Sequence, residues 1–176
     1  SVEATDNRVF TKEVLKSGAS LSRADTRQST LAFVERTMPR HGKHFDGNGI
    51  YLGDIYDPSA LVCDDGSPPT PWDAEVYFPT SRPGGRLPVA WLSSEITTHD
   101  VCGLDFTLLT QDPHSTREIR DAFHRLDIPL SVVDLGGKAK HLCAEHLLVR
   151  PDGFVAWRGA STQGAADFAR LIAKQK

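Results

Sequence analysis

Hydrophobic residues are spaced most regularly in the second half of the chain. The apolar run at residues 104–110 predicts a buried strand, and a second run at 129–135 predicts another. Between them, Ser115 and Glu118 have the spacing of a capping box, which predicts that a helix begins there. One face of that helix carries four apolar residues: Ile119, Ala122, Phe123 and Leu126. The order β-α-β predicts two parallel strands joined by a right-handed crossover.

A hairpin and a terminal helix are predicted next. Residues 146–150 and 154–159 are apolar strand candidates, and Pro and Gly in the intervening 151–153 segment fit a type I turn. A final helix is expected to begin at residues 161–162. Its apolar face carries four residues: Ala165, Phe168, Leu171 and Ile172. Residues 101–176 therefore predict an α/β domain with β-α-β followed by β-β-α, the order of a thioredoxin-like core.

The first 45 residues are polar and only thinly apolar. Leu31, Val34 and Met38 share one helical face, and Pro39 ends that run. Such a narrow stripe is a poor core by itself. We therefore predict that residues 1–45 form a helical arm that packs against something larger.

Residues 46–100 have a third pattern. Six prolines between Pro68 and Pro88 exclude long regular elements. We predict an extended connector of short strands and turns wrapped over the domain. Its apolar, strand-like pieces are residues 50–56, 60–65, 74–79 and 87–92.

Composition and charge exclude several classes of function. The 176 residues have a net charge of −3, so we expect no nucleic-acid partner and no membrane partner, because both prefer a basic surface. Three dispersed cysteines, Cys63, Cys102 and Cys143, favour partly buried thiols in a reducing, cytoplasmic compartment over a disulfide framework. No signal peptide is visible and Ser1 replaces a starting Met, so we expect a chain that is processed, tagged or cut from a longer one.

Thiol–disulfide exchange is not expected. A thioredoxin carries its reactive cysteines between the first core strand and the next helix, whose N-terminus lowers the thiol pKa. That place here is Gln111–Ser115, which contains no cysteine, and Cys102 lies at the other end of the strand. The groove-shaping proline of thioredoxins is replaced by Glu145 and His146. Ser115 is expected to cap a helix rather than to pair with His114 as a nucleophile.

Metal and cofactor motifs are also weak. His141-x-Cys143-x-x-His146 contains zinc-binding residue types, but no second ligand cluster accompanies it. The glycines and lysines of residues 135–140 lack the spacing of a phosphate-binding P-loop, and no G-x-G-x-x-G occurs. The sequence therefore predicts no catalytic, cofactor-binding or metal-binding residue in this chain.

Two motifs together resemble a known family. They are Arg82-Pro83-Gly84-x-Arg86-x-Pro88-x-x-Trp91-Leu92 and Arg150-Pro151-Asp152-Gly153-x-Val155-Ala156-Trp157-Arg158. From about residue 49 to the end, the chain resembles the C-terminal portion of FAD-dependent aromatic hydroxylases, the phenol-hydroxylase-like flavoprotein monooxygenases. One departure is Val89, where many relatives have His.

The resemblance implies a thioredoxin-like domain without redox cysteines. The parent enzyme would use FAD and NAD(P)H to place one oxygen atom of O₂ on a phenolic or related ring. This chain alone would be inactive and would bind no cofactor. It would pack on the flavin- and substrate-binding domain of the same protein, residues 1–45 being the end of that domain, and it would contribute to a homodimer.

The motifs also nominate a surface. A candidate domain-contact motif has six members: Arg82, Pro83, Gly84, Arg86, Trp91 and Arg158. The simpler interpretation is a turn with solvated or carboxylate-paired arginines, with Trp91 and Trp157 as core aromatics. Two other functions stay open: a free-standing thioredoxin-like binding or assembly module without thiol chemistry, and a thiol enzyme that uses Cys102 or Cys143.

Overall fold

The computed structural model describes residues 12, 27–36, 47–56, 59–142 and 145–173. The chain divides into two compact units, Ser1–Gly47 and Asn48–Lys176. In the first unit, residues 27–36 are helical, with Leu31 exposed and Val34 half-buried. Met38 and Pro39, which complete the predicted stripe, lie outside the described residues.

The second unit contains a four-stranded sheet. Its strands are β1 (Phe106–Thr110), β2 (Leu130–Asp134), β3 (His146–Val149) and β4 (Val155–Gly159), in the spatial order β2-β1-β3-β4. β1 and β2 are parallel, whereas β3 is antiparallel to both of its neighbours, as the sequence predicts. The N–H of Gly153 donates to the carbonyl of Arg150 at 2.9 Å, which closes the predicted turn between β3 and β4.

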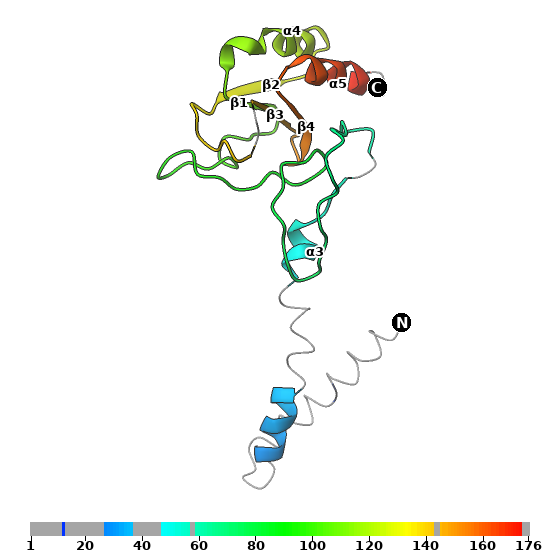
Figure 1. Cartoon of the computed structure of the whole chain (residues 1–176), viewed down its shortest axis with the longest axis vertical. Helices are drawn as coiled ribbons and strands as arrows, with labels where there is room; N and C mark the ends of the chain where they lie inside the picture. The colour runs from blue at the N-terminus through cyan, green and yellow to red at the C-terminus, as the bar shows by residue number, and fades with distance from the viewer. Residues whose placement is uncertain (1–11, 13–26, 37–46, 57–58, 143–144, 174–176) are drawn as a thin grey trace. The chain divides into compact units, whose positions relative to one another are not determined.

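Two helices cover one face of this sheet. They are α4 (Arg117–Arg125), which follows the 3-10 helix η1 (Pro113–Thr116), and α5 (Gln163–Ala173) (Figure 1). α4 buries Ile119, Ala122 and Phe123, as predicted. α5 buries Ala165, Ala166, Phe168 and Ala169. Leu171, which the sequence placed on that apolar face, is 51% exposed, whereas its neighbour Ile172 is half-buried and packs on the core.

The predicted capping box is wrong. Asp112 caps η1 by accepting from the N–H of His114, and Thr116 precedes α4 without a side-chain cap. The Ser115 hydroxyl instead donates to the carbonyl of Asp112 at 3.0 Å. The 3-10 turn moves Ser115 out of the capping position.

Both faces of the sheet are buried, and successive residues alternate between two cores. Leu108, Leu148 and Ala156 pack with the residues of α4 and α5. On the other side, Leu109, Leu147, Val149 and Val155 of the strands form a second core together with Leu135. Leu87 and Leu92 of the connector complete this core. This alternation follows from the two-residue repeat of a strand, and it explains why all of β3 is buried.

The connector contains less strand than the sequence predicts. Its first strand-like piece begins inside a short helix, α3 (Asn48–Leu52). The described part of the connector otherwise has isolated bridges in place of strands: Ile55↔Gly85, Arg86↔Phe154 and Trp91↔Thr97. Gly49 allows α3 to lie against a neighbouring segment, because a Cβ atom there would be 1.7 Å from the carbonyl oxygen of Asp73. The position of α3 therefore depends on the close approach of Gly49 to the backbone of Asp73. The hydrophobic pattern of the sequence does not predict such an approach.

Candidate functional site

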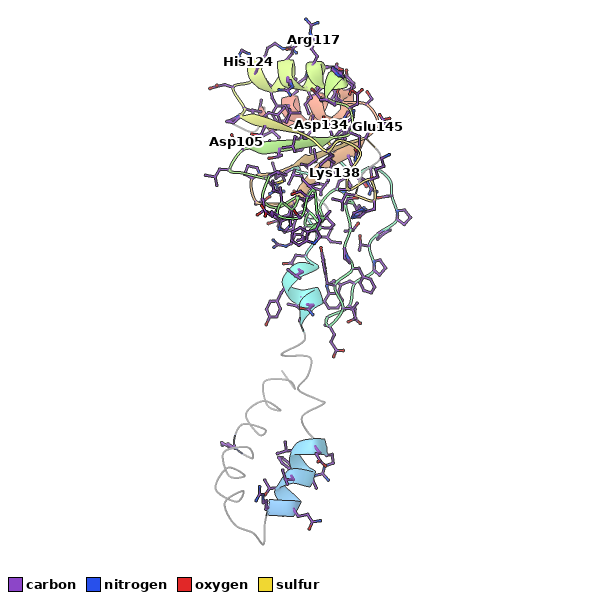
Figure 2. All side chains as sticks on the ribbon, turned by 90° about the vertical axis from the view of Figure 1, so that its left-hand side faces the viewer. Asp105, Arg117, His124, Asp134, Lys138 and Glu145 are labelled. Carbon is purple, nitrogen blue, oxygen red and sulfur yellow. The ribbon has the colours of Figure 1, made fainter. Side chains whose placement is uncertain are left out.

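The place where a thioredoxin would carry its cysteines is one end of the sheet. Thr110 ends β1 and pairs with Asp134 at the end of β2 and with His146 at the start of β3. Figure 2 shows Asp134 and Glu145 at this end, and Asp105, which precedes β1, at the opposite end. Polar side chains of the β1–η1 turn therefore meet β3 here.

Four residues at this end form a closed ring of hydrogen bonds. Thr110 Oγ1 lies 2.8 Å from Nδ1 of His146, and Nε2 of His146 lies 3.2 Å from Ser115 Oγ. The Ser115 hydroxyl donates to the carbonyl of Asp112 at 3.0 Å. The N–H of Asp112 donates back to Thr110 Oγ1 at 3.0 Å, which completes the ring.

One assignment of hydrogens satisfies every group in the ring. The Ser115 proton is directed to the carbonyl of Asp112, so Nε2 of His146 must be the donor to Ser115 Oγ. Nδ1 of His146 is then the acceptor, and the Thr110 hydroxyl donates to it. The geometry therefore assigns His146 as the neutral Nε2–H tautomer.

In this assignment His146 does not activate Ser115 as a nucleophile. A general base must accept the proton of the hydroxyl that it activates, whereas His146 donates a proton to Ser115. His146 is fully buried, and burial lowers its pKa despite the nearby carboxylates of Glu145 and Asp112, which raise it. In the closed ring, His146 joins β3 to the β1–η1 turn through both of its ring nitrogens.

The rest of this end is held by a second set of polar contacts. Gln111 donates through Nε2 to the carbonyl of Lys138 at 2.8 Å and accepts from the N–H of Gly137 at 3.0 Å. The N–H of Gly136 donates to Asp134 Oδ1 at 2.8 Å. Both glycine N–H groups therefore have acceptors within the chain.

Thiol chemistry finds no support among the described cysteines. Burial raises the pKa of Cys102 to about 11, although a hydrogen bond with Thr107 opposes the shift. Burial, and then the charge of Asp167, raise the pKa of Cys63. Both thiols are therefore protonated at neutral pH. Cys143 lies outside the described residues.

The described residues contain no group of three His, Cys, Asp or Glu side chains that could hold a metal ion. Both ring nitrogens of His146 are engaged in the ring, so the predicted zinc-like pattern loses this member. His141 is exposed at the other end of that pattern.

Two arginines of the candidate domain-contact motif are paired inside the chain. Buried Arg82 donates through Nε to the carbonyl of Ser67 at 3.3 Å and lies 3.4 Å from Asp64 Oδ1. Arg158 donates through Nε to Asp65 Oδ2 at 2.5 Å. Burial raises the pKa of Asp65, but hydrogen bonds from Ser67 and Arg158 outweigh it, so that the net pKa is lowered. Carboxylate pairing, the simpler sequence interpretation, is the geometry found.

Two further arginines of the sequence motifs lie over aromatic rings. The guanidinium carbon of Arg86 lies 4.9 Å from the centre of the Phe154 ring, and that of Arg150 lies 4.8 Å from Tyr56. The two rings meet edge to face, with centroids 4.6 Å apart. Gly84 fits beside them because it has φ of 90° and because a Cβ atom would be 2.6 Å from the carbonyl oxygen of Tyr56.

The two motif tryptophans differ. Trp157 is 8% exposed and belongs to the core under the helices, as predicted. Trp91 is 66% exposed, so the prediction of a core aromatic is wrong for this residue. Its backbone forms an antiparallel bridge with Thr97. Buried Pro83 and Gly84 complete the motif.

Sequence analysis missed the ring at the end of the sheet. Two signals were available: Thr110 ends an apolar strand, and His146 stands in the apolar run at residues 146–150. A polar residue within a buried strand needs a hydrogen-bond partner. Their proximity depends on the antiparallel pairing of β1 with β3, which the hydrophobic pattern does not register.

The fold and site define an α/β domain whose polar end holds structural hydrogen bonds. Residues 80–174 match the model of the family described as aromatic-ring hydroxylase, C-terminal, and the chain belongs to that family. This finding confirms the resemblance drawn from the two motifs.

Curated relatives and solved structures agree. The FAD-dependent monooxygenase apdD of Emericella nidulans is 33% identical over 78% of this chain and 24% of its own length. The 2,4-dichlorophenol 6-monooxygenase of Delftia acidovorans is 26% identical over 74% of this chain and 26% of its own. Native and K252c-bound RebC-10x superposes with a TM-score of 0.66 at 30% identity, over 86% of this chain and 29% of that one.

A second structure, the flavin-dependent monooxygenase PieE in complex with FAD and substrate, has a TM-score of 0.60 at 31% identity, over 87% of this chain and 30% of its own. The chain therefore spans about a quarter to a third of the length of the relatives that it matches.

Proposed function

We propose that this chain serves as the non-catalytic C-terminal domain of an FAD-dependent monooxygenase that hydroxylates a phenolic or related aromatic compound. The observation that carries the proposal is the closed ring of Thr110, Asp112, Ser115 and His146, in a chain of the aromatic-ring hydroxylase family. The position that supplies thiol chemistry in a thioredoxin-like fold is used here for internal hydrogen bonds.

FAD and NAD(P)H are assigned to the parent enzyme. Two relatives support this: apdD is an FAD-dependent monooxygenase, and the PieE structure contains FAD. The occupied N–H groups of Gly136 and Gly137 and the pairing of Arg158 with Asp65 support the proposal that the flavin is held elsewhere in the parent enzyme. The flavin, the pyridine nucleotide and the aromatic substrate would be bound by the remainder of the parent.

The proposed partner is the flavin- and substrate-binding portion of the same protein. An exposed apolar patch supports this role, since apolar patches on soluble domains mark interaction sites. The patch lies on α3, which Figure 1 shows away from α4 and α5, and on the neighbouring segment 72–78. Its exposed members are Ile50, Tyr51, Leu52, Trp72, Val76 and Phe78. Of the candidate domain-contact motif, Trp91 is the member whose side chain is largely exposed. A contribution to a homodimer is proposed for the same exposed surface.

The location is proposed to be cytoplasmic, supported by the two protonated thiols and by the net charge of −3. In the described part of the chain, no helix is long and apolar enough to cross a membrane.

Absorbance spectroscopy tests the proposal. The purified 176-residue chain, incubated with FAD and dialysed, should retain no flavin absorbance, and with NAD(P)H and phenol it should consume no O₂. The complete parent enzyme should retain flavin absorbance after dialysis and should consume O₂ with NAD(P)H and phenol. A stoichiometric flavin in the chain alone would sink the proposal.

A free-standing binding or assembly module is the second candidate. It is favoured by the two cores of unit Asn48–Lys176, which cover both faces of the sheet without another chain. Light scattering distinguishes the two: a monomer at all concentrations supports a free-standing module, whereas association through the apolar patch supports a domain that needs a partner.

A further inference from the structure

We propose that the hydrogen-bond ring of Thr110, Asp112, Ser115 and His146 is a pH-sensitive clasp, which ties the β1–η1 turn to β3 while His146 is neutral and opens when it is protonated. This inference rests on the ring itself and not on the proposed function. It would hold equally in a free-standing module.

The hydrogen bonds of the ring follow one donor-to-acceptor order, and a charged imidazole cannot take its place in that order. In the closed ring, Nδ1 of His146 accepts from Thr110, and Nε2 donates to Ser115. A protonated imidazole donates from both nitrogens. The Thr110 hydroxyl must then turn its proton away from His146, and Thr110 is fully buried, with no other acceptor for that hydroxyl recorded among the described residues.

Protonation therefore leaves a buried donor without a partner and places a charge where water does not reach. Both changes favour opening. The strand residues are held by the pairing of Thr110 with His146, so the movable part is the turn. Asp112 and Ser115 are exposed, whereas Thr110 and His146 are not.

The opening has a second consequence on the other side of the turn. The carbonyl of Ser115 accepts from Thr162 Oγ1 at 3.2 Å, immediately before α5. A turn that leaves β3 also loosens this contact. The clasp thus links the start of α5 to the protonation of one histidine, while the four-stranded sheet stays paired.

The described titratable groups around His146 lie beside it in the chain, in the turn, on η1 and on β4. Glu145 beside it and Asp112 in the turn both raise its pKa, and burial, which lowers the pKa, outweighs them. Among the elements packed against it, η1 carries His114 and β4 carries Arg158, whereas β1 has no ionisable residue. The window for opening therefore lies below the ordinary histidine pKa of about 6.5.

NMR of the full chain tests the clasp without any substitution. The ¹⁵N signals of the imidazole should report the Nε2–H tautomer at neutral pH and a pKa below the ordinary value. From about pH 7.5 to about pH 5, the exchange protection of the Asp112 amide should fall at least ~10-fold, whereas that of Leu148 in β3 should not change. An Nδ1–H tautomer, or protection of Asp112 that does not change while His146 titrates, overturns the proposal.

Two variants should shift the pKa of His146 in different directions. In Thr110→Val, Nδ1 loses its donor, so the pKa of His146 should rise and the Asp112 amide should exchange faster even at neutral pH. Ser115→Ala removes the oxygen that accepts the hydrogen bond from Nε2 of His146. A protonated imidazole donates that hydrogen bond more strongly than a neutral one, so the pKa of His146 should fall or stay unchanged. His124→Gln, at an exposed position of α4, is the matched control and should change neither quantity. A reversed pair of signs would mean that Ser115 donates to His146 and that the ring direction is wrong; if a variant does not fold, the titration of the unmodified chain still decides.

Discussion

The two faces of the sheet are covered in different ways. On one face, α4 and α5 pack through apolar residues at helical spacing, such as Phe123 and Phe168. On the other face, the connector has almost no regular structure and packs through Leu87 and Leu92. Figure 1 shows the helices and the connector on opposite sides of the strands.

The difference shows what an irregular covering layer requires. A helix satisfies its own backbone groups and needs only an apolar stripe. The connector needs individual partners: the ring stack of Arg86 on Phe154, the ion pair of Arg158 with Asp65, and Gly84 at positive φ. Loss of one apolar residue should therefore matter most under the helices, and loss of one specific partner should matter most in the connector.

Phe168→Ala should have the largest effect. Phe168 is 2% exposed and lies in the core between α5 and the sheet, so its truncation removes a large apolar side chain and leaves a cavity. We expect the free energy of unfolding to fall by about 3–5 kcal/mol. Urea denaturation followed by circular dichroism measures it. A loss below about 1 kcal/mol would show that α5 is not part of the cooperative core.

Leu87→Ala tests the opposite face. Leu87 is 1% exposed and packs on Leu109 and Leu147, so we expect a loss of about 2–4 kcal/mol in the same denaturation experiment. The decisive result is cooperativity: one transition is expected by circular dichroism and by tryptophan fluorescence. Two separate transitions would mean that the connector unfolds independently of the sheet.

Gly84→Ala tests a partner that has no side chain. The new Cβ atom would meet the Tyr56 carbonyl oxygen at 2.6 Å, on a backbone with φ of 90°. We expect a loss of about 2–3 kcal/mol. Gly66→Ala is the matched control, because Gly66 has φ of 71° but nothing lies within 4 Å of its added Cβ. Equal losses in both variants would assign the cost to φ alone and not to the approach of Tyr56.

Arg158→Met tests the ion pair and should have a smaller effect. Arg158 donates to Asp65 and Ser81, and both of these bonds join β4 to the connector. We expect a loss of about 1–2 kcal/mol at neutral pH, measured by thermal unfolding. Arg170→Met, whose partner Asp167 is exposed, is the control and should cost only a few tenths of a kcal/mol.

The pH dependence of the same pair has a definite sign. The pKa of Asp65 is lowered in the folded chain, so its contribution to stability is present above the unfolded value of about 3.9 and is lost as pH falls below it. Arg158→Met should reduce that acid-side loss. The clasp at His146 acts in a separate window, below about pH 6.5, because burial lowers its pKa. An acid-side loss that Arg158→Met does not change would contradict the ion-pair explanation.

Hydrophobic pattern was enough to predict the helix-covered half of the domain. The order of β1, α4, β2, β3, β4 and α5 follows from apolar runs, from helical spacing and from the turn at Gly153. The same pattern gave wrong predictions where backbone geometry determines the local structure. Gly49 lets α3 lie close to the backbone of Asp73, because it has no Cβ atom, and η1 removes Ser115 from its predicted cap. The ring at His146 depends on strand pairing between residues 36 positions apart, which no local pattern encodes.

Trp91→Ser should have the smallest effect on this chain. Its side chain is 66% exposed, in contrast to Trp157, so its removal should change the free energy of unfolding by less than about 0.5 kcal/mol. If the side chain lies in a contact with the flavin-binding portion, the same substitution should lower the unfolding temperature of the complete monooxygenase, because a large aromatic ring then loses a buried environment. Trp157→Ser is the control that should destabilise both proteins. A large effect of Trp91→Ser on the isolated chain would place Trp91 in the internal packing of the connector and remove it from the candidate domain-contact motif.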